Sequence, residues 1–581
     1  MKSARIPPAS LVLPLLLVAA SGTARASVGG EVSPAEAPAA EAPAARAVES
    51  QAPDASKAAP SAVTWDARAA EHLLNRAGFG GGSADVEKLV AMGQAAAIDS
   101  FFPDPRVAPP PEILAQGSLR GGFESPDERH KTIEARRAGY SRMQPDLIVP
   151  LNKYGDWWIE RMIRSEDPLR ERMTIFWHGH FVSSVKEVGN SHDMIRQLQF
   201  LRDCALGPFE TLVRGIGRDP AMLRYLNNDN NVKDHPNENW ARELMELFSL
   251  GDGNYTETDI KQAARAFTGW SRGPRGFEYK RLDHDFGEKK VLSVDGNLDG
   301  DQIIGIILEQ PACGRFLARK MLAYFEGVPP TAERTEEYAE FLRRNQYDIG
   351  KTLRRLFADP AFYRDEIVSN RVAAPVEYLV SSARRLGIDA PGQMVINAGD
   401  VLGQRLFWPP SVKGWEEGLA WITTSSMMQR SNMIGVMLGL VDVTTLMRDE
   451  EFQGDEAMVD GKKKPVTSRT NGFNHLHYIQ LMGWKPSLSL VDRARGCKAL
   501  VTESRRTGKM TDEALAKWLS GELLAIPYSP ESTREAYEYL RAEREKAGIA
   551  EGALLESADK GETILRGLAH VILSLPEAQL N

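Results

Sequence analysis

The chain has 581 residues, of which 42% are hydrophobic and 26% charged, and its formal net charge is −8. It is long enough to bury a large core, and no stretch has the strongly basic face that nucleic-acid binding requires. Three cysteines, Cys204, Cys313 and Cys497, are too few for a disulfide framework and form no metal-ligand spacing. We expect buried thiols, with one bridge in an oxidising compartment as the alternative.

Residues 1–26 predict a signal peptide. Lys2 and Arg5 give a basic start, residues 11–20 form a short apolar run, and "ARA" at 24–26 offers small residues for cleavage. The apolar run is too short to span a bilayer, and no later stretch reaches that length without charges. We therefore expect an exported protein, periplasmic or extracellular, with no transmembrane segment after cleavage; an uncleaved anchor is the alternative.

Residues 27–62 predict a disordered linker. Ala, Pro, Glu and Ser dominate this stretch, and large apolar side chains are almost absent. Such a chain cannot bury enough surface to offset the entropy lost on ordering. We expect a tether that holds the folded part away from a membrane, a wall or a partner.

Helical periodicity dominates the rest of the chain. Apolar side chains in 167–177 recur at i, i+4, i+7 and i+8, which places them on one face of a helix. Alternating runs bounded by turns are scarce, and 275–296 is the best place for a small hairpin. We predict a mainly α fold: a large multi-helix domain with at most a small β-hairpin. A second helical stretch opens with Thr256 and Asp259, which predict a capping pair at its start. The apolar residues of the stripe in 167–177 are Leu169, Met173, Phe176 and Trp177.

A charged, Gly-containing stretch divides the helical region. Residues 446–472 are poor in core-forming side chains, so we expect an exposed loop there. The loop separates a main helical domain, 63–445, from a C-terminal helical part, 473–581, which we expect to pack on the main domain.

The stretch "NENWARELMELFSLG" (237–251) is the most structured motif. On a helix, Glu243 and Glu246 stand three residues apart and can converge, as ligands or as acid and base. Glu238 and Arg242 lie on the same polar side, and these four residues are our catalytic candidates. The alternative is a solvated ladder in which Arg242 pairs with a glutamate four residues away on either side.

Candidate metal ligands come from two other stretches. "FWHGHF" (176–181) supplies His178 and His180, which face opposite ways if the helix continues, since two positions are about 200° apart. His284 and Asp285 are adjacent, so the carboxylate could orient the imidazole as a ligand. The alternatives are core histidines, and a turn in which Asp285 accepts from main-chain amides.

The stretch "DGNLDGD" (295–301) imitates a calcium loop. The loop pattern requires a bidentate acid at its twelfth position, and Ile306 stands there. Capping of the following helix by Asp299 or Asp301 is the simpler interpretation.

Three tryptophans gather in 406–433. Trp408, Trp415 and Trp421 follow or flank two prolines, which stiffen the loop. They could form a stacking platform for a carbohydrate-like ligand, or an aromatic lock in an irregular core segment.

Several of these stretches together resemble one bacterial family, catalogued as domain of unknown function 1800. They include "FWHGHF", "PNENWARELMELFSLGDGNYTETDIKQAARAFTGW" (236–270), "WPPSVKGW" (408–415) and the terminal "LSLPEAQL", in family order. The resemblance implies an exported, mainly helical protein and supplies no catalytic residues. Where the family often has "YLDN", this chain has Asn227 for the acid, so a metal ligand there would be weakened.

Two functions follow as hypotheses. In the first, the candidate histidines and carboxylates converge in a cleft, hold a divalent metal ion and activate water, as in a hydrolase. In the second, the chain is a non-catalytic binding or assembly module for an envelope protein or polymer. Convergence of His178 or His180 with His284 and an acid would favour the enzyme, and scattered side chains would favour the module.

Overall fold

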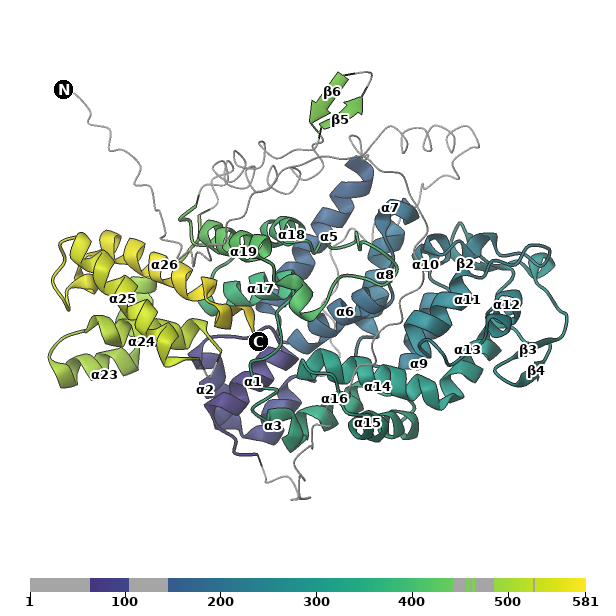
Figure 1. Cartoon of the computed structure of the whole chain (residues 1–581), viewed down its shortest axis with the longest axis horizontal. Coiled ribbons are helices and arrows are strands. Elements are labelled where there is room, and N and C mark those ends of the chain that lie inside the picture. Colours follow the sequence, from purple (N-terminus) through teal and green to yellow (C-terminus); the bar gives the residue numbers. More distant parts are fainter. Residues whose placement is uncertain (1–62, 104–144, 442–455, 460–461, 466–484, 526–527) are drawn as a thin grey trace, which may run out of the picture. The chain divides into compact units, whose positions relative to one another are not determined.

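The computed structural model describes residues 63–103, 145–441, 456–459, 462–465, 485–525 and 528–581. The predicted signal peptide and linker lie outside these ranges, as does most of the predicted loop 446–472. The described chain is mainly helical, as predicted (Figure 1). Among the described helices, none combines the length and apolarity that crossing a bilayer requires.

Short and medium-length helices fill the first part of the described chain. They are α1 (Ala67–Ala77), α2 (Ser83–Met92), α3 (Gln94–Ser100), α5 (Pro145–Arg164), α6 (Pro168–His180), α7 (Val185–Val188), α8 (Ser191–Asp203), α9 (Phe209–Gly217), α10 (Pro220–Tyr225), η2 (Asn228–Asn230), α11 (Asn239–Glu243), the π-helical turn η3 (Leu244–Ser249) and α12 (Glu257–Ala266). Helices α5, α6 and α8 pack on one another (Figure 1).

Helices continue after a short β region. They are η4 (Arg281–Asp283), α13 (Gly300–Glu309), α14 (Pro311–Glu326), α15 (Ala332–Arg344), α16 (Ile349–Ala358), η5 (Pro360–Tyr363), α17 (Pro375–Leu386), α18 (Gly392–Val401), η6 (Gly418–Trp421), α19 (Thr424–Met437), α22 (Leu490–Gly496), α23 (Lys498–Thr507), α24 (Asp512–Leu523), α25 (Pro530–Lys546), η7 (Leu554–Glu556), α26 (Ala558–Ser574) and η8 (Pro576–Gln579). Helix α26 packs on α19, and α24 on α17, so the C-terminal helices join the main body.

The strands form antiparallel pairs of two. Strand β1 (Trp270–Gly273) pairs with β2 (Gly276–Tyr279), and β3 (Lys289–Val291) with β4 (Val294–Gly296). The stretch predicted to form one hairpin therefore takes part in two. A third pair, β5 (Glu456–Val459) with β6 (Lys462–Pro465), lies within the predicted loop 446–472.

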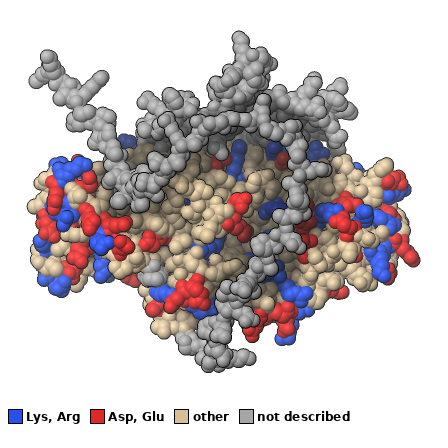
Figure 2. All heavy atoms as spheres, in the orientation of Figure 1, with Lys and Arg blue, Asp and Glu red and all other residues tan. Residues whose placement is uncertain are grey.

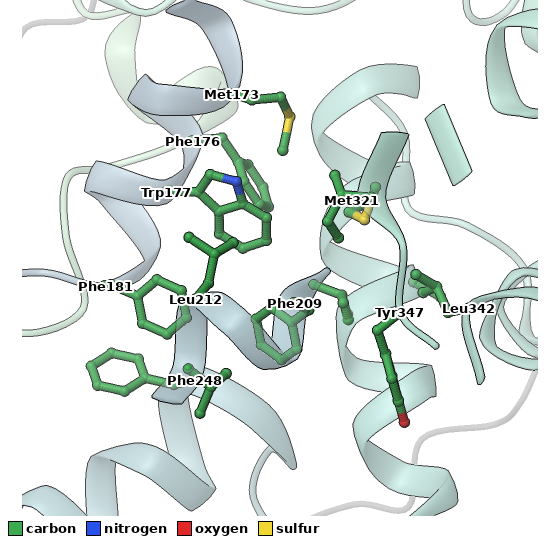
Figure 3. Packing of buried hydrophobic residues seen from close by; sticks show 14 of the residues in the cluster. Met173, Phe176, Trp177, Phe181, Phe209, Leu212, Phe248, Met321, Leu342 and Tyr347 are labelled. Atoms are coloured by element: carbon green, nitrogen blue, oxygen red, sulfur yellow. The ribbon is translucent and has the colours of Figure 1, made fainter. Parts of the chain in front are cut away.

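Two clusters of buried side chains form the core, and α6 contributes to both. Its predicted stripe lies in the first cluster, with no member more than 8% exposed. Figure 3 shows Trp177 with Phe181, Phe209 and Phe248 in this cluster. Ile175, on another side of α6, belongs to the second cluster with Trp158 of α5. Helix α6 is therefore surrounded by protein, which buries its polar residues as well.

Several local predictions are confirmed. Thr256 and Asp259 form a reciprocal capping box at the start of α12. Asp299 caps α13 through the amide of Gln302, which explains the calcium-like stretch without a metal. Cys313 is fully buried, and burial raises the pKa of its thiol to about 12.

All three cysteines are free thiols. Cys204 and Cys497 are half-buried, so full burial was correct for Cys313 alone. The alternative of a bridge is not observed.

Candidate functional site

The histidines of "FWHGHF" lie at the C-terminal end of α6. Asp167 caps the helix by accepting from the Arg170 amide, and Pro168 suits its first turn. The helix runs through His180, so His178 and His180 point to different neighbours, as the periodicity predicted. The two imidazoles therefore do not converge as a bidentate pair of ligands.

His180 joins three segments that are far apart in the sequence. Its Nε2 lies 3.0 Å from the Phe248 carbonyl oxygen, and its Nδ1 lies 3.1 Å from the Lys320 ammonium nitrogen. An ammonium group only donates, so Nδ1 is the acceptor. The ring proton is therefore on Nε2, which donates a hydrogen bond to the Phe248 carbonyl oxygen. Burial, and then the Lys320 charge, hold the pKa of His180 well below its usual value, so the ring is neutral.

His178 is a core aromatic. Its Nε2 accepts the Phe407 amide at 3.3 Å, and its ring centre lies 5.2 Å from that of Trp415 and 6.0 Å from that of Trp158. Burial lowers the pKa of His178 to about 4. This neutral imidazole joins α5 and α6 to the stretch 406–433, which carries the three tryptophans.

His284 and Asp285 lie in the β region, and each has its own partner. His284 Nδ1 bonds to the Thr268 carbonyl at 2.8 Å. The Asp285 carboxylate accepts from Arg265 Nε at 2.7 Å, and this pairing keeps the pKa of Asp285 below its usual value. It also accepts the Gly287 amide, so the turn interpretation of Asp285 is correct.

The predicted metal cluster is not formed. No group of three or more His, Cys, Asp or Glu among the described residues is placed to hold a metal ion. His178, His180, His284 and Asp285 stand in separate environments. The sequence showed suitable ligand types but not the amides, carbonyls and cations that occupy them in the folded chain.

The predicted series of salt bridges in "NENWAREL" forms, but one partner of Arg242 differs from the predicted one. Arg242 Nη2 lies 3.0 Å from Glu238, as i, i+4 spacing suggests. Its Nη1 lies 2.7 Å from a carboxylate oxygen of Glu257 at the start of α12, whereas Glu246 was the predicted partner. Arg242, paired with Glu238 at the start of its own helix, therefore joins α11 to α12 through Glu257 on the surface. The exposure of this pair makes its stabilisation small.

Glu243 and Glu246 lie near enough for the charge of Glu246 to act on Glu243. Burial and then Glu246 raise the pKa of Glu243, while Arg242 and Lys413 oppose the rise. Glu246 accepts a hydrogen bond from the Tyr255 hydroxyl at 3.2 Å. Both carboxylates are half-buried, so this acidic pair stays open to solvent.

The loop "WPPSVKGW" docks on the end of α6. Gly414 has φ +88°, and a Cβ added there would lie 2.7 Å from the Gly179 carbonyl oxygen. A side chain at 414 would therefore be strained and would clash. Trp421 is buried and Trp408 half-buried, which favours the aromatic lock over an open stacking platform.

Periodicity alone did not single out Lys320. It lies on α14, half-buried, with its ammonium 5.7 Å from the centre of the Phe316 ring. Burial lowers its pKa, and Glu417 opposes this. A lysine between apolar positions of an amphipathic helix was the only available signal.

Glu377 forms a hub, a single buried carboxylate with three side-chain partners, that the sequence did not reveal. Its carboxylate is 1% exposed and accepts from Arg172 at 3.1 Å, from Arg371 and from the Tyr324 hydroxyl at 2.9 Å. Burial alone would raise the pKa of Glu377, but Arg371 and Arg172 lower it to about 2. The ion pair with Arg172 joins α17 to α6, and the hydrogen bond from Tyr324 joins α17 to α14.

Two surface cavities lie away from these groups. One of about 230 Å³ is lined by residues that include Glu326 and Arg334. Another of about 450 Å³ is lined by residues that include Arg68 and Tyr363. Neither is lined by a predicted site residue.

The fold and the site define a mainly helical protein whose motif histidines join segments far apart in the sequence. The chain belongs to the family described as "Protein of unknown function (DUF1800)", whose model matches residues 72–580. The resemblance seen in the sequence is thus confirmed. A search of the curated proteins and a search of the solved structures found no match.

Proposed function

We propose that this protein is exported and acts as a non-catalytic binding or assembly module of the cell envelope. The observation that carries this proposal is the internal use of the motif histidines. His180 is hydrogen-bonded to Phe248 and Lys320, and His178 accepts from Phe407. Both ring nitrogens of His180 and the Nε2 of His178 are thus taken up by groups of the chain itself.

Export is part of the same proposal and rests on the sequence. A basic start, a short apolar run and small residues at 24–26 favour a signal peptide. The Ala/Pro-rich stretch 27–62 would then act as a spacer between the folded part and its anchoring point. A partner in the envelope, either protein or polymer, fits this arrangement.

A second candidate function is supported by Glu243 and Glu246. A half-buried carboxylate with a raised pKa beside a second carboxylate is an arrangement that acid–base enzymes use. The hydrolase hypothesis therefore continues on this pair, without the histidines. It predicts that Glu243→Gln abolishes turnover of any substrate found, whereas Glu257→Gln on the exposed ladder does not.

Metal content and envelope binding together test the main proposal. We expect protein purified without chelators to contain no stoichiometric divalent ion, and its melting temperature to be unchanged by EDTA. We also expect saturable co-sedimentation with an isolated envelope fraction. A stoichiometric ion that disappears in His180→Gln would contradict the proposal, and so would the absence of binding to every fraction.

A further inference from the structure

The segment 277–286, which runs from strand β2 into the turn before β3, exposes much apolar surface. Ten large apolar side chains of the described residues are exposed, and four of them lie in these ten positions. Exposed apolar side chains that gather in this way mark binding surfaces. We call these four residues the 277–286 patch: Phe277 (37% exposed), Tyr279 (43%), Leu282 (86%) and Phe286 (49%).

The patch is held in place by buried neighbours. The ring centre of His284, which is 3% exposed, lies 5.5 Å from that of Tyr279 and 4.7 Å from that of Phe286. The buried Lys289 ammonium donates to main-chain carbonyls of the turn 285–287, at 2.6 and 2.9 Å. The apolar side chains are thus presented to solvent by a fixed scaffold, and binding would require little further ordering.

The charges around the patch favour an anionic partner. The exposed ionisable side chains of 275–286 are three cations, Arg275, Lys280 and Arg281, and one anion, Glu278. Two further carboxylates of the segment are half-buried. Counting these two, the three cations and three carboxylates of 275–286 balance, so the positive excess belongs to the exposed side chains alone. Elsewhere on the face drawn in Figure 2, acidic and basic side chains are interspersed. The Arg281 guanidinium lies over the Phe286 ring, 5.4 Å from its centre, which keeps a cation beside the apolar tip.

We propose that the 277–286 patch docks the protein on an anionic lipid surface. Leu282 and Phe286 enter the acyl region, Tyr279 lies at the interface, and Lys280 and Arg281 meet the lipid phosphates. The exposed aliphatic side chain of Leu282 favours a lipid over a sugar polymer. Sugar polymers are bound by stacking on flat aromatic rings, whereas an aliphatic side chain is stabilised most by transfer into hydrocarbon. This inference rests on the proposed binding function and takes the membrane surface, in place of a protein or polymer, as the partner.

Vesicle co-sedimentation of the full chain tests the inference. Wild type is expected to bind vesicles of phosphatidylcholine with phosphatidylglycerol, and to bind pure phosphatidylcholine vesicles much more weakly. Replacing Leu282 and Phe286 by serine should weaken binding about tenfold per side chain. Reversing Lys280 and Arg281 to glutamate should weaken it by at least about tenfold at low salt.

Matched control variants distinguish binding through the 277–286 patch from non-specific binding. Leu419 (80% exposed) and Met428 (65% exposed) are equally accessible, and Leu419 follows two exposed glutamates rather than cations. Their double serine variant should bind as wild type does. Reversing Lys498 and Arg505 on α23 changes the net charge equally and should leave binding unchanged.

The outcomes separate the lipid inference from the proposed function. Failure of wild type to bind anionic vesicles would overturn the lipid inference, as would undiminished binding of the Leu282/Phe286 variant. Binding to a sugar polymer that the same variant loses would also overturn it in favour of that polymer. Saturable binding to another envelope fraction would preserve the module, whereas a stoichiometric metal would remove it.

Discussion

Replacing Glu377 by glutamine removes the carboxylate that Arg172 and Arg371 share, while the shape of the side chain is preserved. Both guanidiniums would then remain at the junction of α6, α14 and α17 without their counter-charge. Removing one partner of a buried ion pair costs about 3–5 kcal/mol. The variant should therefore unfold at distinctly lower urea concentration than wild type.

The pKa of Glu377 gives a second route to the magnitude. It falls from an ordinary value of 4.5 to about 2, a change of about 2.5 units. At about 1.36 kcal/mol per unit, the ionised form is worth on the order of 3 kcal/mol to the folded state. Since the folded pKa is depressed, this contribution is complete above about pH 4.5 and disappears as the pH falls toward 2.

Urea titrations at pH 7 and at lower pH measure both effects. The difference between wild type and Glu377→Gln should shrink as the pH falls below 4.5. Glu366→Gln is the matched control, because Glu366 pairs with Arg364 on the surface and should contribute little. A loss below about 1 kcal/mol for Glu377→Gln, or the same loss in the control, would refute this account of the hub.

Three further predictions test single contacts. The folded pKa of His178 is about 4 against 6.5 unfolded, so wild type should lose stability as the pH falls from 6.5 to 4, by up to roughly 3 kcal/mol; His178→Gln should show a shallower loss in urea titrations. Gly414→Ala should cost about 1–3 kcal/mol in the same assay, because Ala is strained at φ +88° and meets the Gly179 carbonyl; an unchanged midpoint would contradict this. Asn227 is exposed at φ +55°, so Asn227→Ala should cost about 1 kcal/mol and Asn227→Gly almost nothing; equal midpoints for the two variants would contradict a conformational role.

Local patterns in the sequence predicted local structure well. The stripe of 167–177 and the capping box of Thr256 and Asp259 depend on neighbours within eight residues, and the structure has both. The proximity of Glu243 and Glu246 follows from the same short-range geometry. These features need only the helical repeat and the chemistry of free amides at a helix start.

Partners distant in the sequence could not be predicted in this way. Lys320 is 140 positions from His180, and Arg385 is 314 positions from its partner Glu71. Arg242 shows the difference clearly: a partner four residues away was available at Glu246, but packing of α12 brought Glu257 instead. Which cation meets which acceptor depends on how whole helices pack, and that information is spread over the chain.

The hydrogen bonds of His180 also impose an order on the folding of α6. The imidazole must wait for Phe248, 68 positions later, and then for Lys320, a further 72 along the chain. Contacts across such long loops form late, because closing them costs entropy before any packing is gained. During synthesis, α6 stays without these partners until α14 has emerged, and its Arg172 and His178 wait longer still, for Glu377 and Phe407. This buried helix therefore completes its hydrogen bonds only after much of the following chain has been made.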